Sequence, residues 1–92
     1  MKTYKIAITF SSNPKEFWSG NISRYYFAYK RGDKVGLGSN TNAKQYLNRG
    51  SAINMCDKLH TINPNALIEV MKYENNQWVD TEYRQFPNNT EY

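Results

Sequence analysis

The residue types that carry most enzyme chemistry are scarce in this chain. Its one cysteine, Cys56, and its one histidine, His60, lie four residues apart, so both could occupy one face of a helix. A Cys–His pair could act as a nucleophile and its base. Cys56, however, falls within an apolar stripe, and a buried neutral thiol is inert. Two side chains also do not complete a zinc site. We therefore predict no catalytic residues, no metal site and no cofactor, with Cys56 in the core.

Two further patterns suggest a site only superficially. Gly36-Leu37-Gly38 begins like a phosphate-binding loop, but Thr41 stands where the third glycine would be, and no Gly-Lys-Ser/Thr is present. A β-turn accounts for both glycines. Asp80 and Glu82 are the only near pair of carboxylates, and carboxylates that alternate with threonine along an exposed strand indicate a solvated face. Neither pattern predicts an enzyme.

Aromatic and basic residues alternate in the segment Arg24–Arg31, which reads Arg-Tyr-Tyr-Phe-Ala-Tyr-Lys-Arg. Proteins that bind single-stranded nucleic acid use such strands, because rings stack on bases while Lys and Arg meet phosphates. The candidate binding residues are Arg24, Tyr25, Phe27, Tyr29, Lys30 and Arg31. The segment does not match the RNA-recognition-motif consensus, which needs a glycine among its aromatic residues. The alternative is that one aromatic face is core and the basic residues flank the strand ends.

A short amphipathic helix is expected between Ser51 and Ile62. Its apolar residues recur at spacings of three and four: Ala52, Ile53, Met55, Cys56, Leu59 and Ile62. Ser51 is expected as the N-cap, and Asn63-Pro64-Asn65 is expected to stop the helix. Because a helix this short is not stable alone in water, we expect it to lie on a sheet.

Five segments are expected as strands: Thr3–Phe10, Ile22–Arg31, Lys34–Gly38, Ala66–Tyr73 and Gln77–Tyr83. In the fourth, the side of Ala66, Ile68 and Val70 is expected to face the helix. The other side holds Leu67, Glu69, Met71 and Tyr73, and it is too apolar for full solvation, so we expect it to be partly covered or to bind a ligand. Glu74-Asn75-Asn76 is expected as a hairpin turn, because asparagine tolerates positive φ. The segment Ala43–Leu47 fits either a helical turn or a short strand.

The 92 residues are expected to form one domain over residues 1–84, followed by a poorly ordered C-terminal tail at residues 85–92. The expected fold class is α+β, a small antiparallel sheet of four to five strands with one short helix packed on one face. Phe17 and Trp18 are expected to form a lid over one edge of the core.

The net charge of +4 is unevenly distributed along the chain. Residues 1–50 hold nine Lys or Arg and two acidic residues, whereas residues 51–92 hold three and six. The positive half could meet nucleic acid, or an acidic or nucleic-acid-binding protein. The alternative is ordinary solvated charge.

No apolar run is long enough to span a membrane, and the alternation in Met1–Phe10 indicates a strand rather than a signal peptide. We therefore expect no membrane partner and a cytoplasmic location.

Three features between Gly36 and Tyr73 carry a resemblance. They are a hairpin that ends near a polar loop, a short helix that starts with Ser51-Ala52, and the strand Ala66-Leu67-Ile68-Glu69-Val70. This layout resembles small α+β proteins encoded by bacteriophages and other mobile elements, a group that includes anti-CRISPR inhibitors. The composition, rich in Lys, Asn, Ile and Tyr, is similar to that of proteins from AT-rich bacterial or phage genomes. No functional residue carries over from the resemblance.

The resemblance implies a non-enzymatic protein–protein interaction module in the cytoplasm of a bacterial host cell. It would inhibit a host defence protein, such as a nuclease effector, by blocking a nucleic-acid-binding surface. The alternative is a small single-stranded nucleic-acid-binding protein that uses the basic aromatic strand. A third hypothesis is a structural or assembly subunit. The sequence leaves open whether the protein is a monomer or a homodimer.

Overall fold

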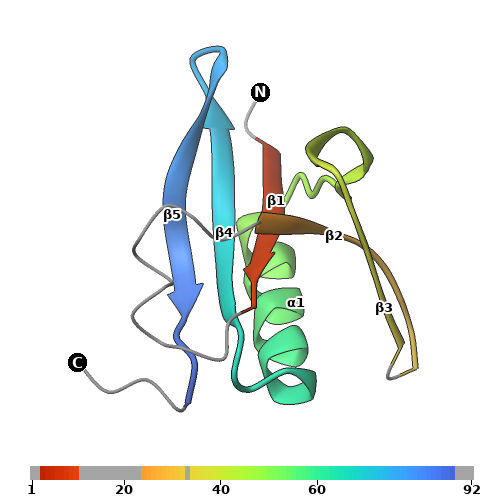
Figure 1. Cartoon of the computed structure of the whole chain (residues 1–92). Helices are drawn as coiled ribbons and strands as arrows, with labels where there is room; N and C mark the ends of the chain where they lie inside the picture. The colour runs from red at the N-terminus through yellow and green to blue at the C-terminus, as the bar shows by residue number, and fades with distance from the viewer. Residues whose placement is uncertain (1–2, 11–23, 33, 89–92) are drawn as a thin grey trace.

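The computed structural model describes residues 3–10, 24–32 and 34–88, without the side chains of residues 40 and 80–82. In this part of the chain, five strands form one antiparallel sheet in the order β3-β2-β1-β4-β5 (Figure 1). The elements are β1 (Thr3–Thr9), β2 (Arg24–Arg31), β3 (Lys34–Gly38), the 3-10 turn η2 (Asn40–Asn42), α1 (Arg49–Ile62), β4 (Leu67–Glu74) and β5 (Gln77–Gln85). The α+β fold class is confirmed, with five strands within the described residues. The expected lid of Phe17 and Trp18 lies outside the described residues.

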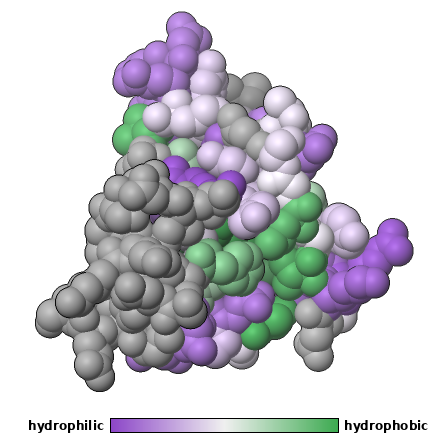
Figure 2. Space-filling view, in the orientation of Figure 1, coloured by the Kyte–Doolittle hydropathy of each residue, from purple (hydrophilic) through white to green (hydrophobic). Residues whose placement is uncertain are grey.

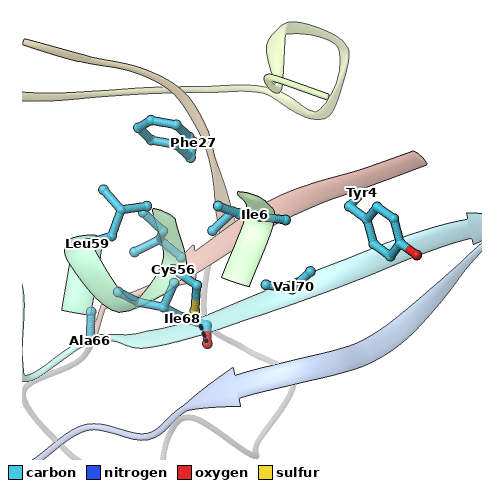
Figure 3. Close-up of a cluster of buried hydrophobic side chains, with 10 residues drawn as sticks. Tyr4, Ile6, Phe27, Cys56, Leu59, Ala66, Ile68 and Val70 are labelled. Carbon is cyan, nitrogen blue, oxygen red and sulfur yellow. Dashed lines mark hydrogen bonds between the residues drawn. The ribbon is translucent and has the colours of Figure 1, made fainter. Parts of the chain in front are cut away.

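The hydrophobic core lies between the sheet and α1. Its strand residues are Tyr4, Ile6, Ile8, Phe27, Ile68 and Val70, and its helix residues are Ala52, Cys56 and Leu59 (Figure 3). We call this side of the sheet the helix face. Ala66, just before β4, belongs to the same cluster, so the predicted orientation of Ala66, Ile68 and Val70 toward the helix is confirmed. Each fully buried aliphatic side chain of this kind stabilises the fold by about 1.5–3 kcal/mol.

The other side of the sheet, here called the second face, is also largely buried. Its buried residues are Lys5, Ala7 and Thr9 of β1 and Leu67, Glu69 and Met71 of β4. Two of them, Lys5 at 2% and Glu69 at 3% exposure, are charged. The expectation that this face is not fully solvated is confirmed.

The helix begins earlier than the sequence predicts. Asn48 is the N-cap, because its side-chain Oδ1 accepts a hydrogen bond of 3.1 Å from the backbone N–H of Ser51. Ser51 therefore lies inside the first turn, and the prediction that it caps the helix is wrong. Asparagine and serine cap equally well, so their types alone could not separate the two positions. The predicted stop is confirmed, since the N–H of Asn63 donates to the Leu59 carbonyl at 2.8 Å.

The β4–β5 hairpin turns at the predicted asparagines. Asn75 and Asn76 have φ of 54° and 65°, as the favoured two-residue hairpin turn requires. The chain after this hairpin differs from the expected tail, because β5 continues to Gln85, Pro87 is buried, and the N–H of Asn88 donates to the Pro64 carbonyl at 2.8 Å. Residues 85–88 are thus part of the folded domain, and the rest of the tail lies outside the described residues.

The β2–β3 hairpin diverges from the sheet after a short pairing with β1. The paired residues are Ala7–Thr9 of β1 and Arg24–Tyr26 of β2. Beyond them, the segment 43–47 lies against both strands: the N–H of Lys44 donates to the Phe27 carbonyl, and Tyr46 exchanges two backbone hydrogen bonds with Tyr4. This segment is neither a helical turn nor a strand, but an isolated bridge. Figure 1 shows β2 curving away from β1, so that the hairpin projects from the body of the molecule.

Among the described residues, no helix is long and apolar enough to cross a membrane.

Candidate functional site

The candidate binding residues all lie on β2, but they do not form one surface. Residues paired directly across a sheet share a face. Tyr25 pairs with Ile8 and so belongs to the helix face, whereas Arg24 pairs with Thr9 on the second face. Regular alternation along the strand would put Tyr25, Phe27 and Tyr29 on one face. In the structure Tyr25 and Phe27 share the helix face, whereas Tyr29 lies on the second face.

Phe27 is a core residue. Its side chain is 1% exposed and belongs to the buried cluster beneath α1 (Figure 3). A ring in this position cannot stack on a base while the protein is folded, so Phe27 leaves the set of candidate binding residues.

Arg24 is held by a buried carboxylate. One of its guanidinium nitrogens lies 3.4 Å from Oε1 of Glu69, and Nε of Arg84 lies 3.0 Å from Oε2 of the same residue. The Glu69 side chain is only 4% exposed, whereas the two arginines are about one third exposed. A buried carboxylate needs such partners, because an unpaired charge in the interior is costly. Arg24 therefore has a structural role in joining β2, β4 and β5.

A β-bulge in β2 exchanges the faces on which the side chains after Phe27 lie. The register changes between Phe27, which pairs with Leu37, and Tyr29, which pairs with Gly36. Consecutive residues of β3 point to opposite faces, so Tyr29 and Arg31 lie on the second face and Lys30 lies on the helix face. Tyr25, the remaining exposed ring of the prediction, lies instead on the helix face, with its ring 6.4 Å from that of Phe10.

The Tyr29 ring lies across a glycine of the edge strand. A Cβ on Gly36 would overlap this ring, so only glycine leaves room for it. The Arg31 guanidinium lies 5.8 Å from the ring centroid, within the range of a cation–π contact. The Tyr29 side chain is nevertheless 52% exposed. This is the aromatic ring of the prediction that remains accessible beside a basic residue.

The end of the β2–β3 hairpin is basic. We use the term hairpin end for Tyr29, Lys30, Arg31 and Lys34. Arg31 and Lys34 are directly paired across the two strands and exposed. Among the described residues, no carboxylate forms an ion pair with Lys30, Arg31 or Lys34. Figure 2 shows hydrophilic side chains standing out at this end, beside apolar surface over the middle of the molecule.

Lys34 was not among the predicted binding residues, although Ile22–Arg31 and Lys34–Gly38 were both expected as strands. Pairing the predicted strands across their glycine-containing turn would have placed Lys34 opposite Arg31. The sequence also did not single out Lys5, whose ammonium lies 3.9 Å from the Trp78 ring centroid and 4.6 Å from that of Tyr26. Two ring faces compensate in part for the buried charge.

Cys56 and His60 do not act together. The Cys56 thiol is fully buried and points to the Ile68 carbonyl at 3.7 Å (Figure 3). Nε2 of His60 instead donates to the Phe86 carbonyl at 2.8 Å. Burial, aided by the negative charge of Asp57, raises the pKa of the thiol to about 12. The prediction that Cys56 is a core residue is confirmed.

Two other sequence patterns can be placed. Gly36 and Gly38 lie within β3, so the expectation that a β-turn accounts for them is wrong. The side chains of Asp80 and Glu82 lie outside the described part of the chain. Within the described part, no three His, Cys, Asp or Glu side chains are grouped so that they could hold a metal ion.

Comparison of the chain with protein-family models, with curated proteins and with solved structures finds no match.

Proposed function

We propose that this protein is a non-enzymatic binding module whose hairpin end docks on an acidic surface of a partner protein. The observation that supports this proposal is the projecting hairpin, which presents Lys30, Arg31 and Lys34 without a carboxylate partner in the described part of the chain. The exposed Tyr29 and Leu37 add apolar contact area next to these charges. Aromatic residues and arginine are the types enriched where protein interfaces are strong.

The biological role we propose follows the resemblance to phage and mobile-element proteins. In the cytoplasm of a bacterial host cell, the module would inhibit a defence protein such as a nuclease effector. A nucleic-acid-binding surface is positive and would repel the hairpin end. We therefore propose that the hairpin anchors on a neighbouring acidic patch, while the rest of the domain covers the nucleic-acid-binding surface.

An affinity capture from bacterial lysate, with and without nuclease treatment, tests this function. The bait is the tagged wild-type protein, a Lys34→Glu variant, or a Lys58→Glu variant. Both lysines are exposed, and Lys58 lies on α1, so the second variant controls for the change in net charge. We expect the wild-type bait to capture a partner protein even after nuclease treatment. The Lys34→Glu bait should fail to capture this protein, and the Lys58→Glu bait should still capture it. Capture of the same partners by all three baits, or capture of no partner, would contradict the proposal.

Binding of single-stranded nucleic acid is the second candidate, and the exposed Tyr29 ring beside Arg31 favours it. The case for nucleic-acid binding is weaker than the sequence suggested. Of the three predicted stacking rings, only Tyr29 lies on the same face of the sheet as Arg31. Fluorescence anisotropy with a labelled oligo(dT) tests it. Binding should weaken steeply with salt, and Tyr29→Ala should cost about 1–3 kcal/mol of binding free energy. Absence of binding at low salt would exclude this function.

A further inference from the structure

The geometry points to β3 as the place where an extended, acidic segment of the partner protein adds a sixth strand to the sheet. This inference rests on the proposed function and names the contact that the hairpin makes. An added strand uses backbone hydrogen bonds for affinity, and its side chains provide specificity.

The first argument is the position of β3 in the sheet. It is the terminal strand in the order β3-β2-β1-β4-β5, and within the described residues its strand partner is β2 alone. A terminal strand presents a row of backbone N–H and C=O groups that another strand can pair with. The hairpin projects from the body (Figure 1), so an incoming segment can approach this edge.

The second argument is the side chains of β3. Gly36 and Gly38 carry no side chain on the second face of the strand, where the Tyr29 ring crosses Gly36 and the Asn42 side chain lies beside Gly38. On the helix face, Leu37 is 37% exposed and Val35 packs against the core. An added strand can therefore place apolar side chains beside Leu37 on one face, and on the other face it meets no β3 side chain at Gly36 and Gly38.

The third argument is charge, which selects the kind of strand. Lys34 begins β3 and is paired with Arg31, and both are exposed. A second copy of this chain that paired through β3 would bring two such basic ends to one small interface, whereas an acidic segment would be attracted. The sheet edge at the other end is β5, which contains Asp80 and Glu82 and lacks this basic character.

The test uses the full chain and a defined probe, a short acetylated and amidated peptide of alternating Glu and Val. With isotopically labelled protein, we expect chemical-shift changes centred on residues 34–38 and slower hydrogen exchange of β3 amides, with a Kd on the order of 0.1–1 mM. Lys34→Glu should weaken binding by about tenfold, and Lys58→Glu should leave it unchanged. A peptide of alternating Lys and Val should not bind.

Three outcomes would overturn the inference. One is the absence of β3 protection with the acidic peptide at about 1 mM. Another is equal binding of the basic peptide. The last is concentration-dependent self-association of the protein that protects β3, because a second copy would then occupy the edge. Circular dichroism of both variants shows whether loss of binding reflects unfolding.

The outcomes also separate this inference from the proposed function. If a captured protein depends on Lys34 but leaves β3 amides unprotected in the complex, the inference fails and the proposed function stands. If capture yields no protein that depends on Lys34, the proposed function fails as well.

Discussion

A single glycine decides where the accessible aromatic ring of the hairpin lies. Gly36 leaves space for the Tyr29 ring to cross the edge strand, and this packing sets the distance from the ring to Arg31. Glycine inside a strand usually destabilises it by about 0.5–1 kcal/mol relative to alanine. An aromatic ring laid over the glycine can offset that cost.

The Gly36→Ala substitution should therefore have opposite effects in two backgrounds. In the wild-type protein, we expect a loss of about 1 kcal/mol in unfolding free energy, because the Tyr29 ring must swing into solvent. In a Tyr29→Ala background, the new methyl group meets no ring, and the same substitution should be neutral or stabilising. Urea denaturation of the wild type, the two single variants and the double variant gives the coupling free energy between residues 29 and 36. Equal effects in both backgrounds would show that the ring does not pack on Gly36.

Glu69 is the buried charge on which two arginines converge, so its neutralisation should be costly. We expect Glu69→Gln to lower the unfolding free energy by about 2–4 kcal/mol, since Arg24 and Arg84 would face each other without an anion between them. Glu74→Gln is the matched control, because the ion pair of Glu74 with Lys72 is more exposed. It should cost under about 1 kcal/mol. Equal losses in thermal denaturation would contradict this role of Glu69.

The Tyr46 hydroxyl is buried and has no hydrogen-bond partner among the described residues. Burial also raises the pKa of this hydroxyl. Removing an unsatisfied buried polar group relieves its desolvation cost, so Tyr46→Phe should stabilise the protein by about 1 kcal/mol. The measurement is the midpoint of urea unfolding. A destabilised variant would mean that the hydroxyl makes a hydrogen bond in solution.

For single residues, the sequence predicted which residue types the hairpin end contains better than it predicted the face on which each side chain lies. The basic and aromatic character of the hairpin end follows from Arg24–Arg31. Assigning its rings to one face assumed an unbroken alternation. One extra residue at the bulge beyond Phe27 inverts that alternation, and no residue type in the segment signals it.

Secondary structure was predictable to the extent that local periodicity encodes it. The strands, the helix and the asparagine turn all follow from spacing or turn chemistry, and the structure contains them. The conformation of segment 43–47 was not predictable, because the backbones of Tyr4 and Phe27 hold it in place. Contacts between residues this far apart in the sequence leave no local pattern.

The start of α1 gives a prediction that separates two neighbouring polar residues. Asn48→Ala should cost about 1 kcal/mol of unfolding free energy, because the Ser51 N–H loses its acceptor in the first turn. Ser51→Ala should cost little or slightly stabilise the helix, because Ser51 is an exposed residue inside it and alanine has the higher helix propensity. Thermal unfolding followed by circular dichroism compares them. The reverse order would restore Ser51 as the N-cap.

The whole molecule joins a rigid body to a projecting hairpin. The Arg24–Glu69 ion pair and the core beneath α1 hold the root of β2 in place, while the basic hairpin end forms no ion pair among the described residues. This arrangement suits a module that presents one preformed strand. A partner would then lose little binding free energy to ordering of the hairpin.

Global stability should fall in alkaline solution because the core contains a thiol. The pKa of Cys56 is raised from 9.0 to about 12 in the folded protein, first by burial and then by the charge of Asp57. The folded state therefore holds the thiol proton more tightly than the unfolded state does. The resulting stability is fully present below about pH 9 and is lost as the pH rises toward about 12.

A Cys56→Ala variant isolates this effect. It should be less stable than wild type near neutral pH, because a buried sulfur is removed. Above pH 9, the stability of the wild type should fall toward that of the variant by up to about 1.4 kcal/mol per pH unit. The pKa of Tyr83 is raised first by its hydrogen bond to Asp57 and least by the charge of Cys56, so Tyr83 titrates in both proteins and only its interaction with Cys56 stays in the difference. Urea denaturation of both proteins at pH 8 to 10.5 measures this difference in unfolding free energy. If the two proteins lost stability in parallel, the thiol would ionise as easily in the folded state as in the unfolded state.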